Sequence, residues 1–147
     1  MYFHVVLILH IIGASIWAGG HIILLFVFLP KALKEKNFKI IETFEIRFEK
    51  IGIPSLISQI VTGVILAYHY NVNFLIWFSF STPIEKVVSI KLLLLILTLI
   101  LAIHAKFFII PKLNNNNLFN LGIHITLITL TAVSMLIIGT FIRFGGF

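Results

Sequence analysis

Four long runs of apolar residues dominate the hydropathy pattern of the chain, and short polar stretches separate them. The runs cover residues 2–29, 51–70, 84–110 and 118–142. Each is long enough to cross a bilayer, which takes about 20 residues of helix. Short connections between consecutive runs predict an antiparallel up-down bundle of four transmembrane helices. We therefore expect an all-α membrane protein in which residues 1–147 form a single domain.

Prolines and an aromatic connection mark the expected ends of these runs. Pro30 and Pro111 are expected to end the first and third helices, because proline lacks the N–H that a helix interior needs. Residues 71–83, NVNFLIWFSFSTP, are aromatic and too short to span. Trp77 and Phe78 are typical of side chains at the level of lipid headgroups. This connection is predicted to be an interfacial loop or a short helix.

Composition agrees with the hydropathy pattern and narrows the chemistry. The 147 residues are 60% hydrophobic and 11% charged, and the mean hydropathy is +1.13. A soluble domain is about half apolar and about a quarter charged. The chain has no cysteine, which excludes disulfides, iron–sulfur clusters and thiol nucleophiles. It also has no aspartate, and no pair of acids falls within the apolar runs for acid–base chemistry.

The positive charge is concentrated in two connections. They hold eight of the eleven basic residues: Lys31, Lys34, Lys36, Lys39, Arg47, Lys50, Lys106 and Lys112. The positive-inside rule therefore places loops 31–50 and 111–117 in the cytoplasm and both termini outside. Topology explains the net charge of +6 better than nucleic-acid binding does, and we expect the lipid bilayer, not nucleic acid, as partner.

Histidines inside the apolar runs are the main candidates for function, because ionisable residues in a membrane are usually functional. At 1.5 Å per residue, His10 lies roughly 30 Å outward of Pro30, and His69 lies roughly 28 Å outward of Lys50. The two are thus expected at one outer level of the bundle. His4 is expected at the outer mouth.

Three further histidines are expected at a second, inner level. His21, His104 and His124 lie roughly 13, 10 and 9 Å from the cytoplasmic ends of their spans. On the first span, His10, Trp17 and His21 also share one helical face, since eleven residues of helix return to nearly the same angle. Such a stripe should face the interior of the bundle.

Paired imidazoles at two depths favour haem. Haem iron in a membrane bundle takes axial ligands from facing helices, and Trp17 would lie beside the porphyrin. The predicted axial ligands are His10 with His69 and His21 with His124, with His104 as a substitute for His124 or its hydrogen-bonding neighbour. The expected cofactor is haem b, one or two per chain.

The basic residues near the outer level suggest partners for a cofactor. Arg143 is a candidate for a haem propionate at the outer level. Lys91, just inside the third span, either extends to the outer interface or meets the carboxylate of a ligand. The expected function is electron transfer, with a quinone or another redox partner. If the protein is an enzyme, we expect a membrane oxidoreductase that acts on a quinone, an oxygen species or a porphyrin.

Other interpretations of the histidines stay open. Three inner imidazoles are a possible copper cluster. Buried histidines hydrogen-bonded to serine, threonine or backbone would be structural, and a proton relay is a further option because imidazole titrates near neutrality. Small residues at Ala14, Ala18, Ser15 and Gly19 permit close helix approach, which leaves a homodimer open.

The order of several motifs resembles a known family. HIIGASIWAGGH, then Leu29–Pro30, RFEKIGIPSLISQIVTGVILA, KLLLLILTLILAIHAKFFIIPKL and the closing GTFIRFGGF resemble the CopD-like family of small integral membrane proteins. The resemblance implies a four-span haem b protein, or copper transport of CopD type, in a bacterial-type inner (plasma) membrane. The stretch LHII…W.AG…LP is also similar to HemJ, which implies protoporphyrinogen oxidation.

Overall fold

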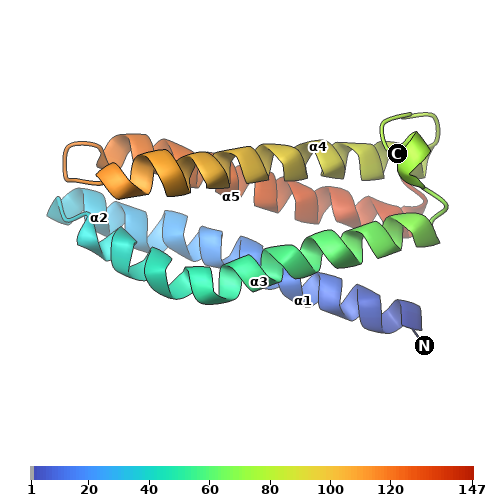
Figure 1. Cartoon of the computed structure of the whole chain (residues 1–147), viewed down its shortest axis with the longest axis horizontal. Helices are drawn as coiled ribbons and strands as arrows, with labels where there is room; N and C mark the ends of the chain where they lie inside the picture. Colours follow the sequence, from blue (N-terminus) through green and yellow to red (C-terminus); the bar gives the residue numbers. More distant parts are fainter. Residues whose placement is uncertain (1) are drawn as a thin grey trace.

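The computed structural model describes residues 2–147, and Figure 1 shows long helices running back and forth along one axis. The helices are α1 (Tyr2–Ile23), α2 (Leu29–Glu35), α3 (Lys39–His69), α4 (Pro83–His104) and α5 (Leu118–Phe141). α2 continues α1, so the chain crosses the bundle four times. The predicted all-α, antiparallel four-helix bundle is confirmed.

The outer surface of the bundle is apolar over most of its length. Four stretches are long and apolar enough to cross a membrane: Tyr2–Glu35, Lys39–His69, Pro83–Lys112 and Leu118–Phe144. Large side chains on their outward faces are open to the surroundings; Phe26 is 70% exposed and Ile100 is 59% exposed. Contiguous apolar surface of this extent needs lipid to cover it. The chain is a multi-pass membrane protein.

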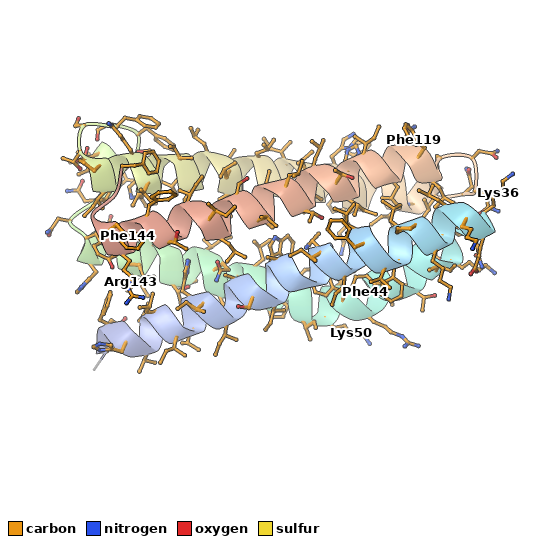
Figure 2. The ribbon with its side chains drawn as sticks, turned by 180° about the vertical axis from the view of Figure 1, so that it is seen from behind. Lys36, Phe44, Lys50, Phe119, Arg143 and Phe144 are labelled. Carbon is orange, nitrogen blue, oxygen red and sulfur yellow. The ribbon has the colours of Figure 1, made fainter. Side chains whose placement is uncertain are left out.

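The two ends of the bundle differ in composition. The "basic end" comprises the turn 36–38 and the connection 113–117, and the "termini end" comprises the start of α1, the connection 70–82 and residues 142–147. Figure 2 shows Lys36 at the first end and Arg143 and Phe144 at the second.

Helical structure continues through Pro30 and Pro111, where the sequence predicted helix ends. Each proline follows a π-helical turn, Leu24–Phe28 before Pro30 and Ala105–Ile109 before Pro111. In these turns the N–H of the residue before the proline bonds the carbonyl five residues back, Leu29 to Leu24 and Ile110 to Ala105. The helical path continues past each proline although the proline has no N–H to donate. The expected bounds of the first and third helices were therefore too short.

The expected loop 31–50 is almost entirely helical. α2 runs to Glu35 and α3 begins at Lys39, so only a three-residue turn separates them. Lys36 takes a left-handed conformation with φ of 49° and ends α2. The second span thus starts twelve residues before the predicted Ile51. Its first turns carry charged residues, so this part of the helix does not appear as an apolar run in the sequence.

The connection 70–82 contains one short 3-10 turn, Phe74–Ile76. This agrees with the second of the two predictions for this connection, a short helix. The side chain of Asn73 accepts a hydrogen bond from the N–H of Leu75 at 3.0 Å and caps this turn. The fully buried Ser89 hydroxyl donates to the carbonyl of Trp77 at 2.6 Å. This bond ties the connection to α4.

Packing is uneven along the bundle. α1 lies along α3 and α5 lies along α4, and in Figure 1 the α4–α5 pair forms the upper layer. At the basic end the layers are joined by a continuous core: Leu24, Leu29, Ala32, Ile41, Leu113, Leu118, Leu121 and Ile125. At the termini end the buried cluster is smaller, Ala67, Val72 and Val88. The bundle is therefore dense at one end and open inside near the other.

The phenyl ring of Phe48 on α3 fills a slot beside Gly20 of α1. A Cβ built on Gly20 would overlap that ring. We expect Gly20→Ala to destabilise the bundle by about 1–3 kcal/mol, the usual cost of overpacking a filled site. Thermal unfolding in detergent, followed by circular dichroism, measures the change. Gly19→Ala is the matched control, because a Cβ there has no neighbour within 4 Å; equal melting temperatures for both variants would contradict the prediction.

Candidate functional site

A large cavity lies between the α1–α3 pair and the α4–α5 pair, in the half nearer the termini end. Its volume is about 680 Å³, and cofactor sites usually enclose roughly 300–1,000 Å³. All four long helices contribute to a mostly apolar wall. In the described part of the chain, the imidazole, ammonium and guanidinium groups on this wall belong to His10, Lys91 and Arg143. Trp17, predicted to lie beside a cofactor, also lines it.

A hydrogen-bond chain on α3 fixes the tautomer of His10. Its Nδ1 lies 2.8 Å from the hydroxyl oxygen of Thr62. That hydroxyl donates its own proton to the carbonyl of Ser58 at 2.5 Å. The Thr62 oxygen therefore accepts from His10, so Nδ1 carries the proton and Nε2 keeps its lone pair. Metal-binding histidines are usually oriented by such a partner on the other ring nitrogen.

Close helix approach holds the backbone around His10. The Gln59 side-chain amide donates a hydrogen bond to the carbonyl of His10. A Cβ on Gly13 would lie 3.0 Å from the Gln59 amide nitrogen, and a Cβ on Gly63 would lie 3.3 Å from Cε1 of His10. Both glycines therefore provide room for the neighbouring side chain. Gly63 makes space for the imidazole itself.

The opposite side of the cavity is basic. Lys91 lies across Gly139 of α5, with its ammonium 3.2 Å from the position that a Cβ would take there. The ammonium thus stays inside the bundle, on the cavity wall. It does not extend to the outer interface, which was one of the two positions predicted for it. Arg143 follows Gly139 by four residues, about 6 Å toward the termini end on the helix, and also lines the cavity.

Two indole groups on the wall have unpaired donors. In the described part of the chain, the Nε1 atoms of Trp17 and Trp77 are the buried side-chain nitrogen and oxygen atoms without a hydrogen-bond partner. Both residues line the cavity. Buried tryptophan N–H groups normally find an acceptor. Both N–H groups are themselves buried, so they lie within the wall and not on its open surface.

His69 does not lie at the level of His10, so the equal heights derived from the sequence are wrong. The ring of Phe3 stacks on His69 at 4.2 Å between centroids, whereas His10 bonds Thr62. His69 is therefore displaced by seven residues, about 10 Å along the helix axis. It is exposed and does not line the cavity. The structure does not bring His10 and His69 together.

The reason is the true start of α3. The heights assumed that Lys50 lies level with Pro30, at the ends of a long loop. Instead Phe28 packs on Phe44 with ring centroids 4.7 Å apart, which places Glu42, not Lys50, opposite Pro30. The error of eight residues shifts every height on the second span.

His21 is enclosed separately between α1 and α3. It is 7% exposed, and its Nδ1 lies 2.8 Å from the carbonyl of Trp17. The rings of Trp17 and Phe48 pack on it, with centroids 4.4 and 5.5 Å away. A backbone carbonyl only accepts, so Nδ1 carries the proton. These contacts are those of a structural histidine, one of the alternatives that the sequence left open.

His104 and His124 form a pair of their own. Nδ1 of His104 lies 3.0 Å from Nε2 of His124, and Nδ1 of His124 lies 3.2 Å from the carbonyl of Asn120. The prediction that His104 neighbours His124 agrees with this contact. His21 is not part of the pair, because its carbonyl opposes Thr129, five residues further along α5. The expected common level of all three is therefore wrong.

The inner histidines do not assemble a three-imidazole cluster. Within residues 2–147, no three histidine or carboxylate side chains gather as they would around a metal ion. The separation of His21 from His104 and His124 accounts for this. The arrangement on which the copper interpretation was based is absent from the described residues.

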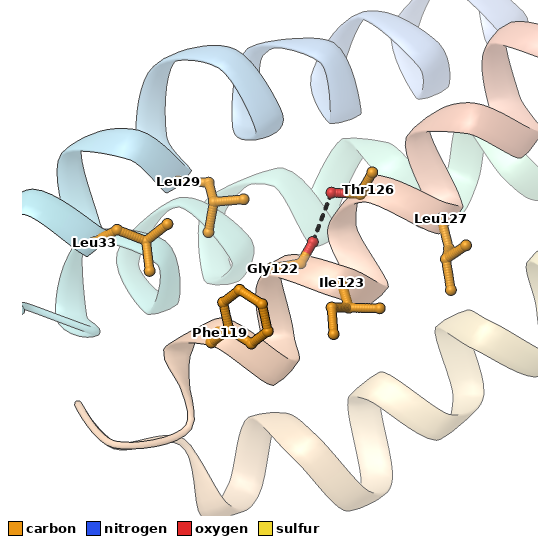
Figure 3. Close-up of a pocket in the computed structure, with 7 residues that line it drawn as sticks. All are labelled: Leu29, Leu33, Phe119, Gly122, Ile123, Thr126 and Leu127. Atoms are coloured by element: carbon orange, nitrogen blue, oxygen red, sulfur yellow. Dashed lines mark hydrogen bonds between the residues drawn. The ribbon is translucent and has the colours of Figure 1, made fainter.

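A smaller hollow lies on the lipid-facing side near the basic end. Its volume is about 270 Å³. Figure 3 shows its lining by Leu29, Leu33, Phe119, Gly122, Ile123, Thr126 and Leu127. The Thr126 hydroxyl donates to the carbonyl of Gly122 at 2.8 Å and is thus satisfied. With no ionisable group on its wall, this hollow carries no chemistry.

The cavity collects some of the predicted site residues and leaves others outside. His10, Trp17 and Arg143 line it, and His69, His21, His104 and His124 do not. Trp77 and Gly139 were not anticipated as parts of a site. Trp77 has the same aromatic character as its lipid-facing neighbours, and Gly139 acquires meaning only through Lys91 on another helix.

No family model, curated protein or solved structure matches the chain. The resemblance to CopD-like proteins and to HemJ therefore stays a prediction.

Proposed function

We propose that this chain is an integral membrane protein that binds haem b in the cavity beside His10 and transfers electrons. The observation that carries the proposal is the position of His10 on the cavity wall, with Nδ1 bonded to Thr62 and Nε2 left with its lone pair. An imidazole held in this way is a good axial ligand.

The rest of the wall fits the same group. The cavity is apolar and of suitable volume for a flat macrocycle, and Gly63 keeps the space beside the imidazole open. Arg143 at the termini end would bind a propionate, as arginine binds carboxylates. When bound, haem b supplies one-electron oxidation and reduction at its iron. The protein contributes the imidazole, the water-poor surroundings and the charge beside the propionate.

The orientation follows from charge. We infer that the basic end faces the cytoplasm of a bacterial-type membrane, because eight of the eleven basic residues lie in the half of the bundle that includes it, on α2, the turn 36–38, the first turns of α3 and the segment 105–117. The cavity then lies in the outer half of the bilayer. This position favours exchange of electrons with a quinone or another redox partner near the outer surface. We propose one haem per chain, since His21, His104 and His124 do not line this cavity.

The test is a reduced-minus-oxidised absorption spectrum of the purified protein, with haem quantified per chain. We expect a Soret band, sharp α and β bands after dithionite reduction, and about one haem b per chain, the stoichiometry of a site with a single ligating imidazole on its wall. Protein that is colourless after expression with a haem precursor, and that takes up no added haemin, would refute the proposal.

A further inference from the structure

The ammonium group of Lys91 is a charge inside the bundle that the preceding proposal leaves unused. It lies on α4, eight residues after Pro83 and thus about 12 Å into the helix. Lysines near membrane interfaces usually extend their ammonium into water. Here the side chain turns across Gly139 instead, and glycine is the residue that leaves room for it. The position is therefore built for an ammonium at this depth.

No acid of the described chain neutralises this charge. Four of the five glutamates lie on α2 or the first turns of α3, toward the basic end. The remaining one, Glu85, accepts hydrogen bonds from Ser79 and from the N–H of Ser81. The ion pair found in residues 2–147 joins Lys106 and Glu49. A charge inside a membrane normally has a partner, so the partner of Lys91 is expected to come from the ligand.

A second cation, Arg143, lies on the same wall of the cavity as Lys91. Arg143 is one helical turn outward of Gly139, the residue that Lys91 covers. The imidazole of His10 belongs to the opposite layer of the bundle. A ligand that reaches from His10 to this wall would therefore present its acid groups to two cations, one half-buried and one exposed.

We propose that Lys91 binds a carboxylate of the cavity ligand, so that the site selects a porphyrin with free acid groups over one whose acids are esterified. The inference rests on the proposed function, because it assigns an orientation to the same ligand. Lys91 and Arg143 together take the two carboxylates, since both cations line this cavity.

Titration of the haem-free protein with haemin and with haemin dimethyl ester tests the proposal. The Soret absorbance reports binding of both compounds. We expect the wild-type protein to bind the free acid about tenfold or more tightly than the diester, the usual effect of a charge-assisted hydrogen bond. Lys91→Met should reduce this preference by about tenfold, and Lys91→Arg should keep most of it.

Lys86→Met is the matched control, since Lys86 is on the same helix but does not line the cavity. It should keep the wild-type preference. A wild-type protein that binds both compounds equally, or a Lys91→Met variant with an undiminished preference, would overturn the role of Lys91 and leave the haem proposal intact. A wild-type protein that binds neither compound would overturn both.

Discussion

Replacement of His10 by alanine is expected to leave the purified protein without its haem spectrum. In the described part of the chain, His10 supplies the imidazole on the cavity wall, and loss of an axial ligand removes the main bond between protein and iron. Haem per chain, measured by the pyridine haemochrome, should fall to background. The same protein should keep its helical circular dichroism, because the change leaves the α1–α3 packing around Gly13 and Gln59 in place.

Two further variants make this result specific. His69→Ala should keep wild-type haem content, since His69 is exposed and stacks on Phe3 outside the cavity. Thr62→Val should retain haem with about 10- to 100-fold weaker binding, the usual effect of losing the partner that orients a ligating histidine. Equal loss of haem in His10→Ala and His69→Ala would contradict a site formed by one chain with His10 alone. Wild-type haem content in His10→Ala would refute the ligand assignment.

Replacement of Gly63 by isoleucine is expected to empty the site without unfolding the bundle. The added Cβ would lie 3.3 Å from Cε1 of His10, and the rest of the side chain would extend into the cavity or displace the imidazole. We expect haem binding to weaken by about 10- to 100-fold, which corresponds to an overpacking cost of about 1–3 kcal/mol. Haem titration of the purified variant provides the measurement.

Gly19→Ile is the control for this substitution. Gly19 also lies within a membrane helix, but a Cβ there would have no neighbour within 4 Å. Its haem affinity should equal that of the wild type. Unchanged affinity in Gly63→Ile would mean that the ligand does not lie beside His10, and equal losses in both variants would point to a general effect of isoleucine on the bundle.

The number, type and direction of the helices follow from hydropathy alone, because a bilayer requires long apolar helices whatever their partners are. The register between helices does not follow in the same way. Height along α3 depended on where the helix begins, and its charged first turns, from Lys39 onward, resembled a loop. Contacts such as Phe28 with Phe44 fix the register, and no pattern within one helix contains that information.

The candidate site shows the same division. The shared face of His10 and Trp17 was predicted from helical periodicity, and both line the cavity. His21 shares that face as well, but it lies beyond the end of the cavity and packs on Phe48. Whether a residue on an inward stripe meets a cavity or a neighbouring ring depends on the size of the side chains opposite. Lys91 could not be assigned from sequence, because its position depends on Gly139 of another helix.

The uneven packing of the bundle has a mechanical consequence. His10 belongs to one helical layer and Lys91 and Arg143 belong to the other, and the cavity separates the layers where protein-to-protein contact is sparse. A ligand bound to both layers would connect them at the termini end, as the apolar core connects them at the basic end. Binding to the folded state alone stabilises that state, and the stabilisation grows with the ratio of free ligand concentration to Kd. Ligand binding in the cavity would therefore make the termini end more rigid and leave the packed basic end unchanged.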